Sequence, residues 1–165
     1  MHNSLLAIIL SALMIVGPVS SDNVAMIRVS DMRDEARVVR EDDLILVLEF
    51  SSDDCAYCRK LEQLFLLPMQ RNAEYDEKIL IRTVSLDNFE TLVDFDGQSM
   101  STAEFASRYE VSLTPTLLFL NAEGKEMSDK LVGIWSEDFY GGFIDSRIDE
   151  AREKLTHVGL AKSGI

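Results

Sequence analysis

The sequence predicts an α/β protein with a central mixed β-sheet that is flanked by helices on both faces. Two observations carry this prediction. Apolar runs of strand length alternate with segments whose apolar residues recur at helical spacing, which is the order expected of an α/β domain. The last two predicted strands follow each other through a turn, so the sheet combines parallel strands with an antiparallel end.

The first half of the chain contains four expected elements: a helix at residues 30–42, a strand at 44–48, a helix from residue 55 that continues in a second segment to 75, and a strand at 79–86. Ser30 and Asp31 suit the N-terminus of the first helix. The run at 44–48 is apolar without alternation, which is typical of a central strand covered on both faces. Pro68 lacks a backbone N–H and must end or kink its helix.

The second half contains a short inserted helix at 101–109, strands at 114–120 and 130–134, and a final helix at 136–155. Ser101 and Glu104 form a capping-box pattern after a turn at 94–97. Pro115 stands at the beginning of its strand, where a sheet tolerates proline. The final helix is expected to pack through five apolar residues at helical spacing: Phe139, Phe143, Ile144, Ile148 and Leu155.

Cys55 and Cys58 are the only cysteines in the chain, and they directly follow the first predicted strand and its loop. On a helix, positions three apart lie on one face, so the two sulfurs can close a small ring with little movement of the backbone. At a helix N-terminus the first thiolate is stabilised by unpaired backbone N–H groups and by the helix dipole. The pair therefore predicts a reversible dithiol–disulfide couple.

Three other uses of the cysteine pair fit less well. A zinc site needs four ligands, and the chain adds only His2 and His157, at its opposite ends, so no metal is expected. A purely structural disulfide would gain little, because the loop that it closes is short. Haem attachment requires a histidine directly after the second cysteine, where this chain has Arg59. No cofactor is expected.

The N-terminal 21 residues are typical of an export signal. Two apolar runs are followed by Gly17 and Pro18, and the small residues at 19–21 suit cleavage before Asp22. The segment lacks Lys and Arg, and an uncleaved membrane anchor is the alternative, although the stretch is shorter than the ~20 apolar residues of a spanning helix. Export predicts a periplasmic or other oxidising location. Residues 22–158 are expected to form one domain and residues 159–165 a flexible tail.

The chain is strongly acidic, with 16 Lys and Arg against 29 Asp and Glu and a formal net charge of −13. Nucleic acid is not an expected partner, because phosphate binding requires clustered positive charge. We attribute the acidity to solubility rather than to the choice of a basic partner. The protein is expected to be a monomer.

These residues together resemble the thioredoxin superfamily. The resemblance spans most of residues 30–155 and rests on the strand at 44–50, Cys55-Ala56-Tyr57-Cys58, Thr114-Pro115-Thr116, Gly124 and Gly133. Within the superfamily the chain is most similar to exported SoxW-type thioredoxins, through its Cys-x-Tyr-Cys-Arg-Lys-Leu run and the insertion at 94–97. The resemblance implies a thioredoxin fold with a helical insertion before the strand that begins at Pro115.

The chain departs from the usual thioredoxin pattern in several places. Asp54 stands where thioredoxins usually carry Trp, and Ala56 and Tyr57 stand where they carry Gly and Pro. The substrate range and reduction potential of cytosolic thioredoxins therefore do not carry over. Trp135, the only tryptophan, is interpreted as a packing residue of the core or hairpin rather than a site residue.

Roles at the site follow from this resemblance and from thiol chemistry. Cys55 is expected to be the nucleophile and Cys58 the more buried resolving cysteine. Glu49 matches the buried acid that is thought to carry a proton for the resolving cysteine, and the alternative is a strand-end carboxylate that reaches water. Asp53 and Asp54 disfavour a Cys55 thiolate.

Three further residues are candidates for substrate binding. The resemblance implies a cis bond between Thr114 and Pro115, which would leave the Thr114 backbone free to pair with an extended substrate, whereas a trans proline would simply open the strand. Tyr57 either offers an aromatic surface at the mouth of the site or packs on its helix.

The leading hypothesis is an exported thiol–disulfide oxidoreductase that reduces disulfides in client proteins and is recharged by a membrane thiol electron donor. A disulfide isomerase or thiol oxidase is one alternative, although isomerases usually need a dimerisation module that is not evident here. A non-enzymatic redox-sensing binding module is the other. The sequence alone does not separate reductant from oxidant.

Overall fold

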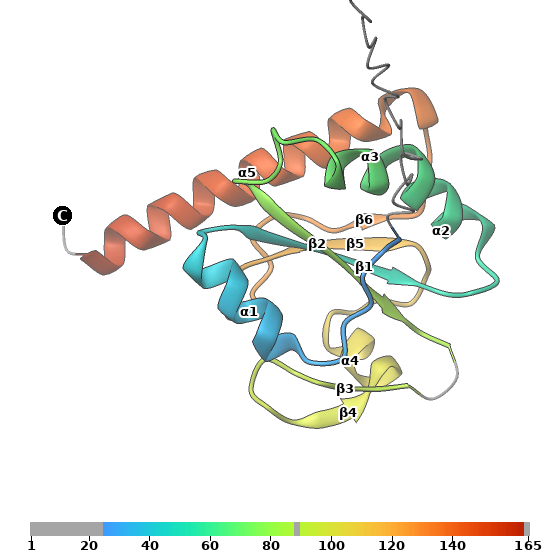
Figure 1. The fold of residues 1–165 in the computed structure, drawn as a ribbon, viewed down its shortest axis with the longest axis horizontal. Helices are drawn as coiled ribbons and strands as arrows, with labels where there is room; N and C mark the ends of the chain where they lie inside the picture. Colours follow the sequence, from blue (N-terminus) through green and yellow to red (C-terminus); the bar gives the residue numbers. More distant parts are fainter. Residues whose placement is uncertain (1–24, 88–89, 164–165) are drawn as a thin grey trace, which may run out of the picture.

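The computed structural model describes residues 25–87 and 90–163 and contains the predicted mixed sheet (Figure 1). Its four strands lie in the order β2-β1-β5-β6. Their bounds are β1 Ile45–Ser51, β2 Ile79–Ser85, β5 Thr116–Leu120 and β6 Leu131–Val132. β1 pairs in parallel with β2 and antiparallel with β5, which in turn pairs antiparallel with β6. The predicted export signal at 1–21 lies outside the described residues.

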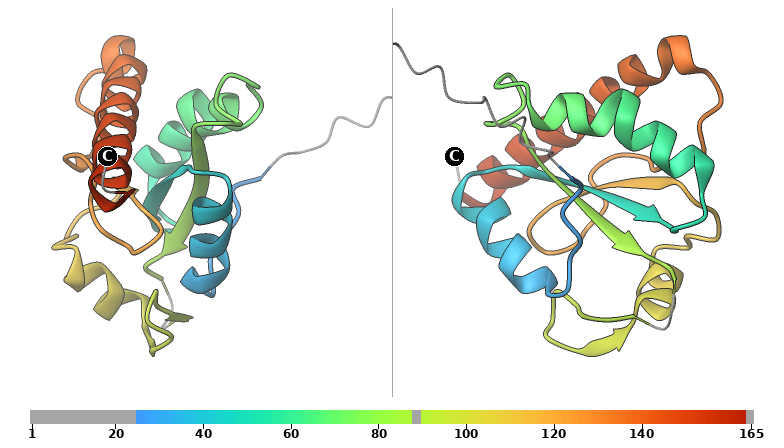
Figure 2. Two further views of the ribbon diagram at one scale, coloured as in Figure 1. Left: turned by 90° about the vertical axis from the view of Figure 1, so that its left-hand side faces the viewer. Right: turned by 45° about the vertical axis from the view of Figure 1, so that its right-hand side comes forward.

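Helices cover both faces of this sheet, as predicted (Figures 1 and 2). One face is covered by α1 (Met32–Glu41) and α4 (Thr102–Arg108). The other is covered by α2 (Ala56–Leu61), α3 (Leu67–Gln70) and α5 (Glu137–Ser163).

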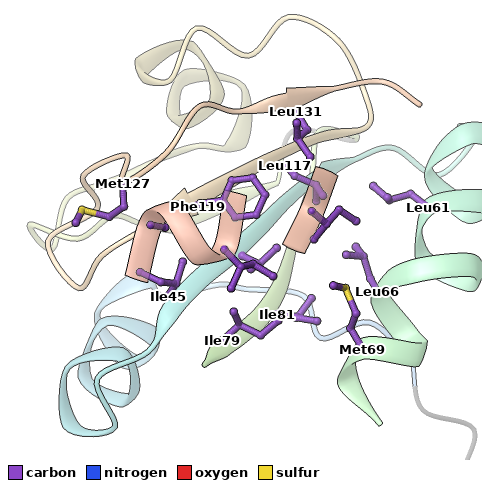
Figure 3. Packing of buried hydrophobic residues seen from close by; sticks show 14 of the residues in the cluster. Ile45, Leu61, Leu66, Met69, Ile79, Ile81, Leu117, Phe119, Met127 and Leu131 are labelled. Atoms are coloured by element: carbon purple, nitrogen blue, oxygen red, sulfur yellow. The ribbon is translucent and has the colours of Figure 1, made fainter. Parts of the chain in front are cut away.

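Strand β1 is central because both of its faces are covered, and all seven of its residues are buried. Successive side chains point to opposite faces, so the strand contributes to two separate cores. Ile45 and Val47 join the core under α2, α3 and α5 (Figure 3), whereas Leu46, Leu48 and Phe50 join the core under α1 and α4. Glu49 points to the same side of the strand as Val47, so its carboxyl group enters the core under α2, α3 and α5.

The predicted helical insertion between β2 and β5 contains a feature that was not predicted, a separate hairpin formed by β3 (Thr91–Val93) and β4 (Ser99–Ser101). Ser101 caps α4 by accepting a hydrogen bond from the Glu104 N–H at 3.1 Å, which confirms the helix start. In the turn, the Asp94 carboxylate accepts hydrogen bonds from the backbone N–H groups of Asp96 and Gln98. Arg108 of α4 pairs with the same carboxylate at 2.5 Å.

The helix that begins after Cys55 is continuous to Gln70, with one wider π-helical segment at Glu62–Leu66. The Leu67 N–H donates to the Glu62 carbonyl five residues earlier. Pro68 follows in the first turn of α3, where its missing N–H costs least. The predicted second helical segment at 69–75 was misplaced, because α3 ends at Gln70 and Tyr75 lies in turns that lead to β2.

The packing predicted for the final helix was wrong for two of its five residues. Tyr140, Ile144, Ile148 and Ala151 are buried, whereas Phe139 and Phe143 are exposed. α5 also extends to Ser163, past the predicted end at 155 and into the segment expected to form a flexible tail. Strand β6 has only two residues of the predicted 130–134. Within the described ranges, every helix is too short or too polar to cross a membrane.

Candidate active site

The cysteine pair stands where β1 passes into the helix that follows it. β1 ends at Ser51, a short loop follows, and Cys55 is the N-cap of α2. The Cys58 N–H points at the Cys55 sulfur at 3.0 Å, and the Arg59 N–H donates to the Cys55 carbonyl at 3.2 Å. The Cys58 N–H, a donor of the first helical turn that has no intrahelical partner, therefore points at the sulfur of Cys55, an arrangement that favours a thiolate there.

Cys55 and Cys58 form a disulfide with their Cα atoms 5.2 Å apart. Their environments differ, because Cys58 is only 1% exposed while Cys55 is partly accessible. An incoming sulfur can therefore reach Cys55 more easily than Cys58. None of the described His, Cys, Asp and Glu side chains gather in groups of three or more that could hold a metal ion.

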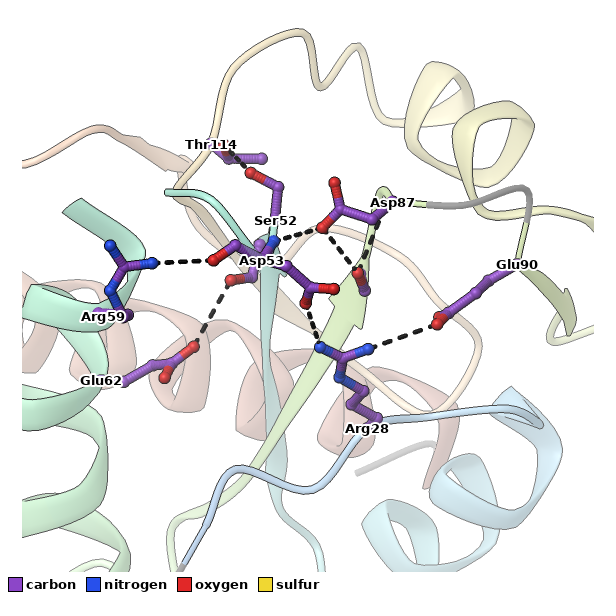
Figure 4. A network of polar contacts seen from close by, with 10 residues as sticks. Arg28, Ser52, Asp53, Arg59, Glu62, Asp87, Glu90 and Thr114 are labelled. Atoms are coloured by element: carbon purple, nitrogen blue, oxygen red, sulfur yellow. Dashed lines mark hydrogen bonds and ion pairs between the residues drawn. The ribbon is translucent and has the colours of Figure 1, made fainter. Parts of the chain in front are cut away.

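A polar network fixes the loop before Cys55 (Figure 4). Arg28 pairs with Asp53 at 2.5 Å and with Glu90 at 3.4 Å, so a segment from the N-terminal end of the described chain is bound to this loop. The Asp53 backbone N–H donates to the Asp87 carboxylate, and the Arg59 guanidinium donates to the Asp53 carbonyl at 2.8 Å. Arg28 offsets part of the negative charge that Asp53 brings near the cysteines.

Glu49 is fully buried on β1, six residues before Cys55. Neither of its carboxyl oxygens has a hydrogen-bond partner among the described residues. Burial raises the pKa of Glu49 to about 8, and the nearby Glu62 carboxylate contributes in the same direction. The hydroxyl of Thr83, which stands opposite Glu49 on β2, opposes the shift and is the smallest of the three contributions. Glu49 does not reach water, so the strand-end alternative is wrong.

Glu62 is a residue that the sequence reasoning missed. It lies on the helix that follows Cys58, is partly buried, and its carboxylate is 3.5 Å from the Ser51 hydroxyl. Burial raises the pKa of Glu62, although the Ser51 hydrogen bond and the charges of Arg28 and Arg59 oppose the rise. The available signal was its spacing, since it lies four residues after Cys58 on one helix.

Thr114 and Pro115 lie beside the loop that precedes Cys55. The Ser52 and Thr114 hydroxyls are 3.4 Å apart (Figure 4), and the Thr114–Pro115 peptide bond is cis. The Gly133 N–H donates to the Pro115 carbonyl at 2.8 Å. The structure therefore brings β1, β5 and the end of β6 together next to the disulfide.

Tyr57 and Trp135, the two aromatic residues that the sequence analysis considered, are both exposed. Tyr57 is among the most exposed large side chains and lines a shallow groove of about 610 Å³ along the outer surface of α2. It is not packed on its helix. Trp135 was predicted to be a packing residue of the core or hairpin, yet it is 54% exposed and contacts the buried Tyr140 ring edge-on, with centroids 5.2 Å apart.

Comparisons with known proteins found one family model and several solved structures that are similar to this chain. The family model of the thioredoxin-like domain matches residues 32–143. A thioredoxin from Fasciola hepatica is 22% identical, with a TM-score of 0.49, and the match covers 74% of this chain and 99% of the other. The thioredoxin NaTrxh from Nicotiana alata is 19% identical, with a TM-score of 0.46 and coverage of 75% and 96%. The search of curated protein sequences found no match.

The family model covers well over half of the chain, and its span contains the disulfide, the buried acid and the strand that begins after Pro115. A CxxC disulfide at a helix N-terminus is the chemical group that thiol–disulfide exchange requires. The chain therefore belongs to the thioredoxin-like domain family and is a thiol–disulfide oxidoreductase.

Proposed function

We propose that this protein is exported and reduces disulfides in client proteins, with Cys55 as the nucleophile and Cys58 as the resolving cysteine. The observation that carries the assignment of roles is the unequal exposure of the two sulfurs at the start of α2. The accessible sulfur meets the client, and the buried one acts after a mixed disulfide has formed.

The exchange proceeds in two balanced steps from the dithiol form. The Cys55 thiolate attacks one sulfur of the client disulfide, forms a mixed disulfide, and releases the other client sulfur as a thiolate that takes up a proton. The Cys58 thiolate then attacks the Cys55 sulfur and releases the second client thiol. The protein ends as the Cys55–Cys58 disulfide, oxidised by two electrons, and the client disulfide becomes two thiols.

Glu49 is proposed to accept the proton of Cys58 when Cys58 attacks. A carboxyl group with a pKa of about 8 exists in both protonation states near neutral pH, as a proton carrier must. Glu62, partly exposed and coupled to Glu49, would pass that proton toward the surface.

Substrate binding is proposed at Thr114, Pro115 and Tyr57. Among the described residues, no backbone group pairs with the Thr114 N–H or carbonyl, so both are available to an extended client segment. Tyr57 offers an exposed ring beside Cys55.

Insulin reduction by dithiothreitol tests this proposal. Wild-type protein should accelerate the precipitation of insulin chains, Cys55→Ser should not, and Cys58→Ser should accumulate a mixed disulfide with the client. Catalysis that survives Cys55→Ser would remove the assignment. Equilibration with a glutathione buffer then gives the reduction potential, which separates a reductant from an isomerase or thiol oxidase.

Export and recharging by a membrane thiol donor are part of the same proposal. They rest on the apolar N-terminal run that ends in small residues at 19–21. Mass spectrometry of the protein secreted by an expression host, showing a chain that begins at Asp22, would support cleavage of the signal.

A further inference from the structure

Most exposed large apolar side chains gather around one part of the molecule. In the described chain, Ile27 is the one such side chain that lies elsewhere. The others lie on the helix that follows Cys55, on the loop before Pro115, on β6, or between β6 and the second turn of α5. In chain order they are Tyr57, Leu64, Leu113, Val132, Trp135, Phe139 and Phe143. The last three lie together between β6 and the second turn of α5, apart from the disulfide and from the proposed contacts of Thr114, Pro115 and Tyr57. We name Trp135, Phe139 and Phe143 the aromatic face.

The aromatic face is an organised surface rather than scattered side chains. Phe139 and Phe143 are four residues apart on α5, so they lie on one side of the helix. The centroids of the Trp135 and Phe143 rings are 5.5 Å apart, and Trp135 also packs against the ring of the buried Tyr140. Phe139 is 70% exposed. Gly142 lies beside them, and a Cβ there would meet no atom within 4 Å. Rigid aromatic rings bind at low entropic cost.

Two contacts join the segment that carries this face to elements beside the disulfide. The Gly133 N–H donates to the Pro115 carbonyl, and Trp135 follows two residues later. Lys60 of α2 pairs with Glu137 in the first turn of α5. The segment between β6 and α5 therefore contacts the loop of Pro115, and the first turn of α5 contacts the helix of Cys55.

The charge around the face favours a basic partner. Residues 131–146 contain three acidic residues and no Lys or Arg, and the flanking Lys130 and Arg147 are each paired with a glutamate. Glu137 is paired with Lys60 and Asp145 accepts a hydrogen bond from Tyr75, whereas Asp138 has no ion-pair partner in the described chain. A second copy of this chain, at −13, and an anionic lipid surface would both be repelled. A partner with basic residues would be attracted.

We propose that the aromatic face binds a client polypeptide segment that presents an apolar side chain flanked by Lys or Arg, close in space to the disulfide that Cys55 attacks. This inference rests on the proposed function, because it names the class of client that the same site takes. The sequence analysis attributed the acidity of the chain to solubility alone. Under this proposal, the acidic residues near the aromatic face also contribute to the choice of client.

The binding test uses peptides without a cysteine, so it does not depend on redox activity. One peptide carries a Phe flanked by Lys, and its twin carries Glu in place of Lys. Trp135 is the only tryptophan, so its fluorescence reports binding at the face directly. The Lys peptide should bind, Phe139→Ser should weaken binding ~10-fold, and the Glu twin should bind more weakly still. Ile27→Ser, which removes an exposed apolar side chain elsewhere, is the matched control and should bind as the wild type does.

The kinetic test compares two disulfide substrates. The first is a series of Lys peptides to which one cysteine is added at different distances from the Phe, each joined through that cysteine by a disulfide to 2-mercaptoethanol. Phe139→Ser should lower kcat/KM for the best member of this series by ~10-fold. The rate with hydroxyethyl disulfide, which is too small to reach α5, should not change.

The outcomes separate the two proposals. Equal losses on both substrates, preference for the Glu twin, or a wild-type dimer that Phe139→Ser dissociates in sedimentation velocity would overturn the docking face. A wild type that reduces neither substrate but still binds the Lys peptide would refute the proposed function and leave the docking face standing.

Discussion

Two carboxyl groups are buried among the residues that the structure describes, and their pKa values move in opposite directions. Glu49 on β1 is 0% exposed and Asp94, before the turn between β3 and β4, is 1% exposed. The pKa of Glu49 rises to about 8 because burial opposes its charge and Glu62 adds to that effect. For Asp94, burial alone would raise the pKa. The backbone N–H of Gln98 and the guanidinium of Arg108 outweigh burial, so its pKa is lowered.

The difference shows what separates a structural carboxylate from one that can move a proton. Asp94 is charged because N–H donors and a cation are aimed at it, and its charge organises the insertion. Glu49 has no such partners among the described residues and stays neutral until the pH approaches 8. Burial sets the cost of charging either group, and the partners decide whether that cost is offset.

The strongest test of the comparison is Glu49→Gln, which keeps the shape of the side chain and removes its proton chemistry. We expect the rate at which Cys58 resolves a mixed disulfide to fall ~100-fold near neutral pH, because a general base normally contributes at least that much. Stopped-flow measurement of mixed-disulfide decay gives this rate. An unchanged rate would mean that Glu49 carries no proton.

The same variant should change how stability depends on pH. The folded pKa of Glu49 lies above the ordinary glutamate value of 4.5, so its contribution to stability is present below about 4.5 and is lost as the pH rises through 8. Glu49→Gln lacks this loss and should gain on the wild type by up to roughly 3–5 kcal/mol between these limits. Urea unfolding at several pH values measures the difference, and a constant difference would contradict the assignment.

The second test removes the other carboxylate. Asp94→Ala leaves the Arg108 guanidinium and the N–H groups of Asp96 and Gln98 without their acceptor. We expect the free energy of unfolding to fall by about 3 kcal/mol, while the rate of Cys58 resolution stays unchanged. The pKa of Asp94 is lowered, so this loss should shrink as the pH falls through the folded value.

The exposed Asp96, two residues away, provides the matched control for the second test. Asp96→Ala should change the free energy of unfolding by less than about 0.5 kcal/mol. Similar losses for the two variants would show that Asp94 stabilises the insertion no more than a surface residue does.

The smallest effect is expected from Glu62→Gln, which removes a neighbouring negative charge but can keep the hydrogen bond to Ser51. Because the Glu62 charge raises the pKa of Glu49, its removal should shift the pH midpoint of Cys58 resolution downward by less than about one unit. A pH–rate profile measures the shift. A midpoint that moves upward would show that the two acids are not coupled as proposed.

Local patterns predicted a large part of the fold. The unbroken apolar run of β1, the capping box at Ser101 and the proline before β5 each act through adjacent residues, so the sequence contains all that they need. The β3–β4 hairpin was missed because strands of three residues show too little alternation to detect. Periodicity alone also failed to identify the buried side of α5, because the packing of the helix on the sheet places Tyr140, and not Phe139, in the core.

The site divides in the same way. By itself, the sequence determined the chemistry, because two cysteines at helical spacing after a strand can form a disulfide wherever the strand lies. Only the tertiary structure decided the environment: it buried Glu49 without a cation, placed Glu62 beside it, supplied Arg108 to Asp94, and left the aromatic face uncovered. The reason is physical, since pKa values and exposure depend on which distant segments pack against a residue, and no spacing along the chain encodes that.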